Sequence, residues 1–150
     1  MDQQPFASTE SVLAAIREVA EERGRAMAVT HDIGADRTSR RLAAGVGTVA
    51  DADGSLPHEA FVELGDSPRV EIQLYSEGDA TIDVDGVVFH DLPRADVPDF
   101  LRSVYGGAAH VSGRLFPPGW RLVVPLPGDR TYRELVQTPG LTPWLSSRVR

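Results

Sequence analysis

Apolar and polar side chains alternate along three consecutive stretches between residues 60 and 90, and this period of two constrains the fold more than any other feature. In "RVEIQLY", Val70, Ile72 and Leu74 fall on one face, and Glu71 and Gln73 fall on the other. The stretches "AFVEL" and "TIDV" repeat the pattern. Such alternation is typical of strands that bury one face and expose the other. We therefore expect neighbouring strands that cover a core with one face only.

A tight turn joins two of these strands. Asp85-Gly86 lies between "TIDV" and "VVFHD", and Asp-Gly between alternating apolar runs is the strongest short signal for a β-hairpin. The aspartates of this stretch also invite comparison with a calcium-binding loop. In that alignment, however, Leu92 occupies the position that needs a bidentate glutamate, and Thr81 occupies the first ligand position. The stretch therefore predicts a turn and not a metal loop.

Two stretches show the apolar spacing of helices. The first spans residues 9–23, and either Ser8 or Thr9 can cap it. Residues 96–105 begin at Asp96, which we expect to be the N-cap residue. Each helix has one apolar side, so each is expected to pack on the core through that side.

The C-terminal third adds two strands around "PPG", in "AAHVSGRLF" and "WRLVVPLP". We expect a short third helix in "RTYRELV" and a proline-punctuated tail over residues 139–150. The order of these elements predicts an α+β fold. Residues 1–150 are expected to form a single domain, a mostly antiparallel β-sheet with the two main helices packed on one face.

The composition narrows the chemistry. The chain has 150 residues, which is the length of one domain, and no cysteine, which excludes disulfides and thiolate metal sites. The N-terminus lacks the pattern of a signal peptide, and no apolar run approaches the roughly 20 residues of a membrane span. We therefore expect a cytoplasmic protein without a membrane partner. No motif indicates a cofactor.

The net charge of −7 is distributed unevenly. Residues 1–50 carry seven acidic residues and six arginines, a balance of −1. Residues 51–100 carry thirteen acidic residues and two arginines, a balance of −11, and residues 101–150 carry two acidic residues and seven arginines, a balance of +5. The acidic middle argues against nucleic acid as a ligand of that surface, because binding phosphate requires clustered basic residues. Two interpretations remain, a solvated sheet face or a docking surface for a basic protein partner. The candidate partner-binding residues are Glu63, Glu71, Asp79, Asp83 and Asp85.

The basic C-terminal third allows two further hypotheses. In the first, Arg114 and Arg121 lie beside the acidic strands of the same chain and neutralise part of their charge. In the second, the arginine-bearing end of one chain meets the acidic face of another in a homodimer. Leu141, Trp144 and Leu145 would then anchor the contact, because tryptophan and arginine are enriched at interface hot spots.

Two His-Asp dipeptides, His31-Asp32 and His90-Asp91, provide an alternative function. Both pairs are expected at strand ends, and two histidines with carboxylates can bind a catalytic metal. The chain would then be a small metal-dependent hydrolase. This hypothesis requires the two strand ends to meet. The sequence has no complete motif for a catalytic nucleophile or a phosphate-binding loop.

The stretches "VDGVVFHDLP", "VPDFLRSVYGG", "RLFPPGWRLVVPLPGDRTY" and "GLTPWL" resemble uncharacterised proteins of GC-rich actinobacteria over about the C-terminal half of the chain. A GC-rich genome also fits the absence of lysine and asparagine. In size, acidity and α+β pattern, the chain is similar to immunity proteins of bacterial polymorphic toxin systems. That similarity implies a non-enzymatic antitoxin that binds a cognate toxin, and it assigns no role to individual residues.

Overall fold

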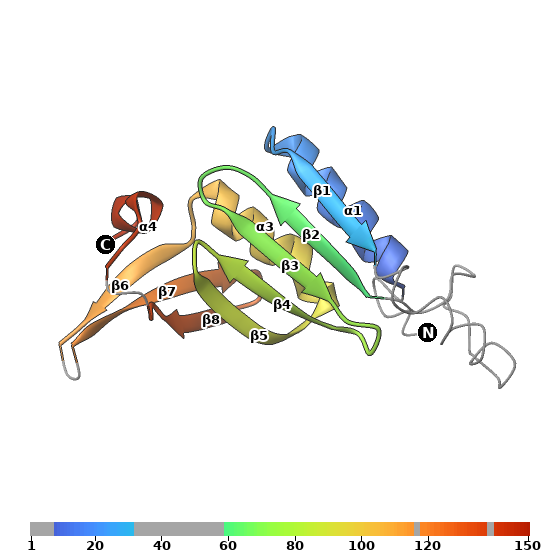
Figure 1. Cartoon of the computed structure of the whole chain (residues 1–150). Coiled ribbons are helices and arrows are strands. Elements are labelled where there is room, and N and C mark those ends of the chain that lie inside the picture. Colours follow the sequence, from blue (N-terminus) through green and yellow to red (C-terminus); the bar gives the residue numbers. More distant parts are fainter. Residues whose placement is uncertain (1–7, 32–58, 116–117, 138–139) are drawn as a thin grey trace, which may run out of the picture.

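The computed structural model describes residues 8–31, 59–115, 118–137 and 140–150 (Figure 1). In these ranges the chain forms two antiparallel sheets, three α-helices and one 3-10 helix. The α+β class predicted from the sequence is confirmed. The elements are α1 (Thr9–Glu22), β1 (Met27–His31), β2 (Ala60–Leu64), β3 (Val70–Leu74), β4 (Asp79–Val84), β5 (Val87–Pro93), η1 (Arg94–Asp96), α3 (Val97–Gly106), β6 (His110–Arg114), β7 (Gly119–Leu126), β8 (Arg130–Leu135) and α4 (Pro143–Ser147).

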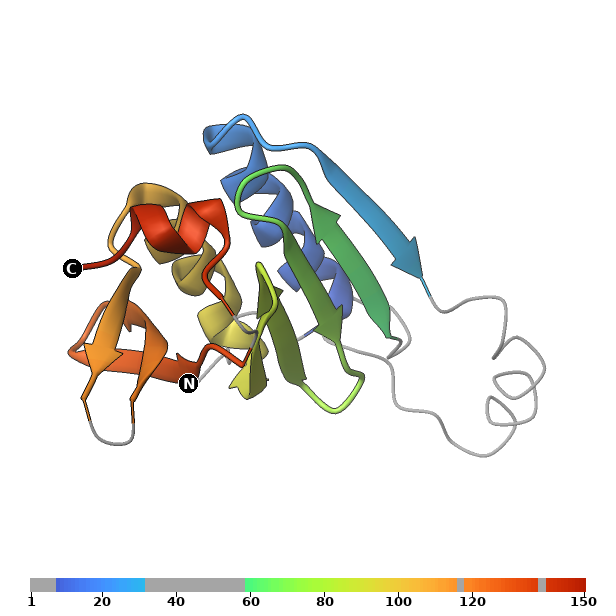
Figure 2. The same ribbon diagram turned by 60° about the vertical axis from the view of Figure 1, so that its left-hand side comes forward.

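The first sheet has the strand order β1-β2-β3-β4-β5, so each strand pairs with its neighbour in the chain. Val62, Ile72 and Ile82 lie directly opposite one another on β2, β3 and β4, and all three are fully buried. Helices α1 and α3 lie against this face (Figures 1 and 2). The opposite face of β2, β3 and β4 is not covered by a helix of the described residues. The alternation in the sequence therefore identified the buried face correctly.

The turn between β4 and β5 is the predicted hairpin. Asp85 and Gly86 both have positive φ, 52° and 94° respectively. Two consecutive residues with positive φ are the mark of a type I′ turn, which matches the twist of the flanking strands. Asp83 supports the turn, because its carboxylate accepts a hydrogen bond of 2.7 Å from the N–H of Gly86.

Strand β5 continues beyond the point where the sequence suggested an end. It contains a β-bulge at which His90 and Asp91 together lie opposite Thr81 of β4. Asp91 adopts a φ of 57°, and the strand then resumes its pairing up to Pro93. The expectation that His90-Asp91 closes a strand was therefore wrong, because the bulge absorbs the irregular residue without ending the pairing.

The second sheet has the order β6-β7-β8, and its last strand corrects a prediction. In the stretch "RTYRELV", which was expected to be helical, Arg130–Leu135 form β8. Gly128 and Asp129 have positive φ and close a short turn after β7, which brings Tyr132 directly opposite Val124. Pairing with β7 outweighs the helical propensity of Arg, Glu and Leu, because strand preference depends strongly on context.

Asp96 is the N-cap residue of α3 by position, as the sequence predicted, and its side chain connects the start of this helix to β8. Its buried side chain makes no capping hydrogen bond. One carboxylate oxygen accepts from Arg130 at 2.5 Å, and the other accepts from the hydroxyl of Tyr132 at 2.7 Å. Burial of the phenol is the main cause that raises the pKa of Tyr132 to about 12, and the hydrogen bond to Asp96 is a smaller one. Phe100 of α3 packs beside the Tyr132 ring, with centroids 6.1 Å apart. This contact fixes β8 to the start of α3.

The C-terminal segment is part of the fold. Helix α4 buries Trp144 and Leu145 in the core of the same chain. After α4, Val111 of β6 donates its N–H to the carbonyl of Arg148 at 2.8 Å, and Arg150 donates its N–H to the carbonyl of Val111 at 3.0 Å. The segment thus lies parallel to the edge of β6. Trp144 and Leu145 are therefore unavailable as anchors of a homodimer.

Candidate protein-binding face

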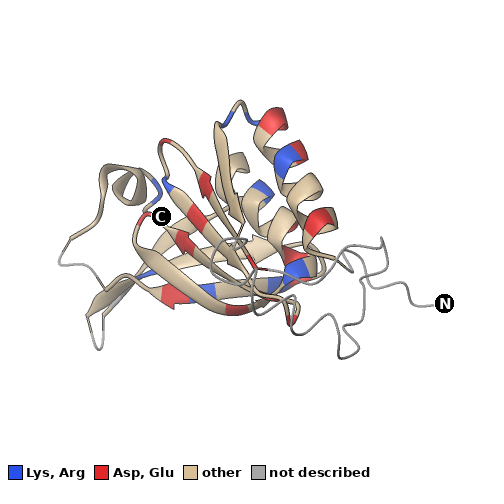
Figure 3. Ribbon diagram, turned by 45° about the vertical axis from the view of Figure 1, so that its right-hand side comes forward, with Lys and Arg blue, Asp and Glu red and all other residues tan. Residues whose placement is uncertain are grey.

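Three acidic side chains form a row across the uncovered face of the first sheet. Glu63 of β2 lies directly opposite Glu71 of β3, which lies directly opposite Asp83 of β4. Figure 3 shows the acidic positions on these adjacent strands. Neighbouring strands are about 4.8 Å apart, so the row spans roughly 10 Å. Like charges in direct cross-strand pairs destabilise a sheet. We call Glu63, Glu71 and Asp83 the acidic row.

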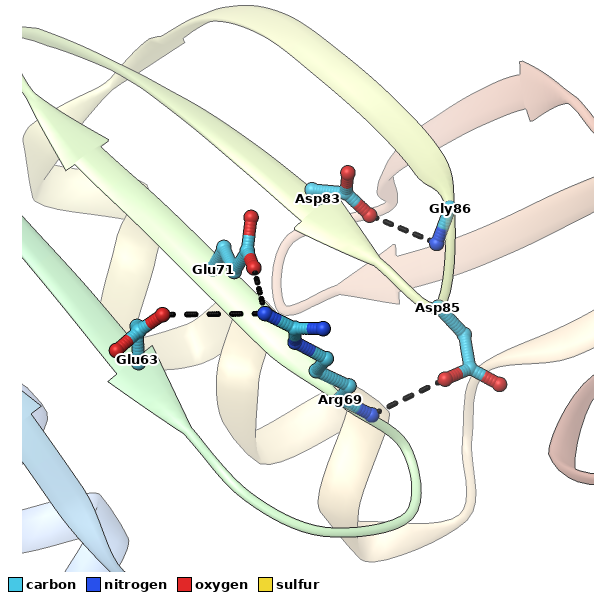
Figure 4. Close-up of polar contacts among 6 residues, drawn as sticks. All are labelled: Glu63, Arg69, Glu71, Asp83, Asp85 and Gly86. Atoms are coloured by element: carbon cyan, nitrogen blue, oxygen red, sulfur yellow. Dashed lines mark hydrogen bonds and ion pairs between the residues drawn. The ribbon is translucent and has the colours of Figure 1, made fainter.

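Arg69 partly neutralises the acidic row (Figure 4). Its guanidinium Nη2 lies 2.6 Å from a carboxylate oxygen of Glu71 and 3.8 Å from one of Glu63. The Arg69 side chain is 68% exposed, so each pair contributes only about 0–1 kcal/mol. Sequence reasoning missed Arg69 and assigned this role to Arg114 and Arg121. Those two residues lie on β6 and β7, in the second sheet.

Asp85 has a structural role beside the row. One carboxylate oxygen accepts from the N–H of Arg69 at 3.1 Å, and the other accepts from the hydroxyl of Thr142. The N–H of Asp85 also donates to the carbonyl of Arg69 at 2.8 Å. These bonds hold the β4–β5 turn against the residue before β3 and the start of α4. The carboxylate of Asp85 is thus already engaged within the chain.

Asp79 lies away from the acidic row. It precedes Asp83 on β4 by four residues, which corresponds to about 13 Å along a strand. Its Oδ1 is buried, with no hydrogen-bond partner in the part of the chain that the structure describes. Of the five candidate residues, the structure therefore brings together Glu63, Glu71 and Asp83 on one face and places Asp85 at their edge.

Two depressions lie near the acidic row, one at the row itself and one beside it. One has a volume of about 300 Å³ and is lined by Arg69, Glu71, Asp83, Asp85 and Gly86. The other has a volume of about 260 Å³ and lies two residues from Glu63 and Glu71 along β2 and β3. Phe61 lies there on the uncovered face, half-buried and directly opposite Gln73. Alternation alone could have placed Phe61 on this face. The second depression is lined by Thr30, His31, Glu59, Ala60, Phe61 and Gln73.

The two histidines of the proposed metal site are not brought together. His31 ends β1 and His90 lies on β5, which are the two edge strands of the first sheet. Four interstrand spacings separate these edges, about 19 Å along the sheet, whereas a shared metal requires both imidazoles within about 2 Å of it. Asp32 lies outside the described residues. Within the described ranges, no group of three or more histidines and carboxylates could hold a metal ion.

Comparison with known proteins finds no match among family models, curated proteins or solved structures.

Proposed function

We propose that this chain is a non-enzymatic protein-binding module of immunity or antitoxin type, located in the cytoplasm. Its acidic row binds a basic protein partner such as a cognate toxin. The observation that supports this proposal is the in-register alignment of Glu63, Glu71 and Asp83 on the sheet face that no helix of the described residues covers. No helix in the described part of the chain is long and apolar enough to cross a membrane.

The acidic row is easier to explain as a binding surface than as a solvated face. A face that serves solubility alone does best with charges of both signs interspersed. Here three carboxylates occupy consecutive strands, and Arg69 contacts two of them from one end. Guanidinium or ammonium groups of a partner would replace the repulsion within the row by attraction. Charge complementarity of this kind accelerates encounter and selects the partner.

The uncovered face also offers an apolar contact. Phe61 is half-buried on β2, two residues from Glu63 and on the same side of the strand. Interfaces typically combine an aromatic centre with polar residues around it. The depression beside Glu71 and Asp83, about 300 Å³ in volume, can receive one arginine or lysine side chain. We therefore propose a partner surface that presents basic side chains next to an apolar one.

The experiment compares two triple variants with the same change in net charge. The first, Glu63→Gln/Glu71→Gln/Asp83→Asn, neutralises the acidic row. The second neutralises three acids elsewhere, Glu18 and Glu21 on the exposed side of α1 and Glu77 before β4, all exposed. Each variant and the wild type are co-expressed with the protein encoded by the neighbouring reading frame. Co-purification and titration calorimetry then measure binding at low and high salt.

We expect the row variant to bind at least about tenfold more weakly than the wild type, which corresponds to about 1.4 kcal/mol. The matched control should bind within about twofold of the wild type, because its charges lie on other surfaces. Binding by the wild type should weaken as salt rises. Equal binding by the two triple variants would overturn the proposal. So would the absence of any complex between the wild type and the co-expressed protein.

A further inference from the structure

Exposed apolar side chains gather at one place on the second sheet. The described residues include four large apolar side chains with high exposure, Leu115 (85%), Trp120 (40%), Leu135 (45%) and Val149 (41%). Three of these four line a single groove of about 520 Å³. Such clustering distinguishes an interaction surface from the scattered apolar residues of an ordinary surface. We call this surface the Trp120 groove, lined by Gly113, Leu115, Pro118, Gly119, Trp120, Val149 and Arg150.

The Trp120 groove lies between the β6–β7 hairpin and the C-terminal segment. Gly113 of β6 lies directly opposite Trp120 of β7. The indole ring comes within 3.1 Å of the position that a Cβ on Gly113 would occupy. Val149 forms the other wall, because it pairs in parallel with Val111 of β6. Figures 1 and 2 show this hairpin extending away from the first sheet, so the groove is remote from the acidic row.

We propose that the Trp120 groove binds the same groove of a second copy of this chain, forming a two-fold symmetric homodimer. A two-fold interface uses the same patch on both subunits, so the patch must complement itself. The Trp120 groove contains both parts of such a contact. Leu115 projects into solvent from the end of β6, and a hollow of about 520 Å³ lies beside it. In the dimer, Leu115 of each copy enters the hollow of the other.

Charge favours a second copy at the Trp120 groove over one at the acidic row. Two copies with a net charge of −7 each repel one another. Among the described residues, the lining of the Trp120 groove includes no carboxylate and one cation, Arg150. It lies in residues 101–150, the third of the chain with a balance of +5. Two acidic chains therefore meet with less repulsion through this groove than through the acidic row, and apolar burial drives the contact.

This dimer differs from the one suggested by the sequence, in which basic and acidic faces meet. Contact between opposite charges weakens as salt rises, whereas screening reduces the net repulsion between two acidic chains. The dimer through the Trp120 groove should therefore strengthen with salt. This dimer leaves the acidic row free to bind a partner. If the protein does not form the dimer, the proposed function of the acidic row is therefore unaffected.

Light scattering over a range of protein and salt concentrations tests the proposal. The wild type should approach twice the 16.2 kDa mass of one chain as its concentration rises. Leu115→Glu should shift the dissociation midpoint at least about tenfold toward higher concentration. The matched control is Leu135→Glu, the same change at an exposed leucine that is outside the groove. The control should shift the midpoint less than about twofold, a change well below 1 kcal/mol.

Tryptophan fluorescence provides a second readout. Trp120 is exposed in the single chain, whereas Trp144 is buried. Dimer formation should therefore shift the emission to shorter wavelength through Trp120, and Trp120→Phe should abolish the shift. A wild type that stays monomeric under all conditions would overturn the proposal. A dimer that Leu115→Glu and Leu135→Glu weaken equally, or one that dissociates as salt rises, would overturn it as well.

Discussion

Replacing Thr142 with valine removes one hydroxyl and leaves the side-chain volume nearly unchanged. That hydroxyl makes two hydrogen bonds at the start of α4. It accepts the N–H of Leu145 at 3.2 Å and donates to the carboxylate of Asp85. Asp85 in turn accepts the N–H of Arg69. Thr142→Val therefore tests whether the C-terminal segment is held to the β4–β5 turn through this side chain.

The expected loss follows from these two bonds. Removal of an N-cap oxygen typically costs about 1 kcal/mol, and a hydrogen bond to a charged group contributes about 1.5–3 kcal/mol. Thr142 and Asp85 are half-buried, so water can replace part of the second contribution. We expect Thr142→Val to lower the free energy of unfolding by about 2–3 kcal/mol. For a chain of this length the melting temperature should fall by roughly 5–10 °C.

Urea denaturation and thermal unfolding measure this loss. Fluorescence is a suitable probe, because Trp144 is buried two residues after Thr142. Thr142→Ser retains the hydroxyl and is the matched control. It should change the free energy of unfolding by less than about 0.5 kcal/mol. If valine and serine reduce stability equally, the hydroxyl contributes nothing and the reasoning fails.

Three further predictions concern other contacts. Asp83→Asn should raise the free energy of unfolding by about 0.3–0.7 kcal/mol at low salt, because it removes repulsion from Glu71 and retains an acceptor for the N–H of Gly86. Thermal unfolding at low and high salt measures this gain, and a gain that persists at high salt would contradict the prediction. Tyr132→Phe should lower the free energy of unfolding by about 1–2 kcal/mol near neutral pH. The pKa of Tyr132 is raised from 10.0 to about 12, so the stabilisation by its hydroxyl is present below pH 10 and lost as the pH rises through 12. Denaturation at several pH values should show that the stability difference between variant and wild type shrinks between pH 10 and 12, and a constant difference would contradict the prediction. Gly86→Ala should lower the free energy of unfolding, measured by urea denaturation, by about 1–2 kcal/mol, because Gly86 has a φ of 94°. The control is Gly140→Ala, at a residue with ordinary φ and open space around it. This control should lose clearly less stability.

The sequence predicted the first sheet well because its pattern is local. Alternation identified the buried face of β2, β3 and β4, and Asp85-Gly86 identified the hairpin. In a strand, consecutive side chains point to opposite faces, so the position of one apolar residue fixes the direction of the others. The same argument placed Glu63, Glu71 and Asp83 on the exposed face.

The second sheet and the C-terminal segment depend on contacts between distant residues. The stretch "RTYREL" has no decisive local pattern, and Tyr132 is fixed by Val124 and by Asp96. Trp144 resembled an exposed anchor because proline and arginine surround it in the sequence. Its burial depends on the docking of α4, and a sequence pattern does not record that contact.

In the candidate site, too, the sequence predicted what depends on local pattern and missed what depends on contacts between distant residues. Alternation gives the face on which a residue lies, and it does not give the strand order. His31 and His90 could therefore have met or lain at opposite edges, and only the order β1-β2-β3-β4-β5 decides. Likewise, Asp85 belongs to the acidic part of the sequence, yet Thr142 engages its carboxylate from a position 57 residues away in the chain.

The acidic row is tolerated because the opposite face of the same strands is fully apolar. On each strand, one of Val62, Ile72 and Ile82 is the sequence neighbour of the row residue, and all three are completely buried. Each such side chain stabilises the fold by about 1.5–3 kcal/mol, whereas two carboxylates about 6 Å apart in water repel by only about 0.7 kcal/mol. The buried face therefore holds the three carboxylates in place against their mutual repulsion. A basic partner meets charges that are already positioned, so it loses little conformational entropy in ordering them and relieves a repulsion that the free chain retains.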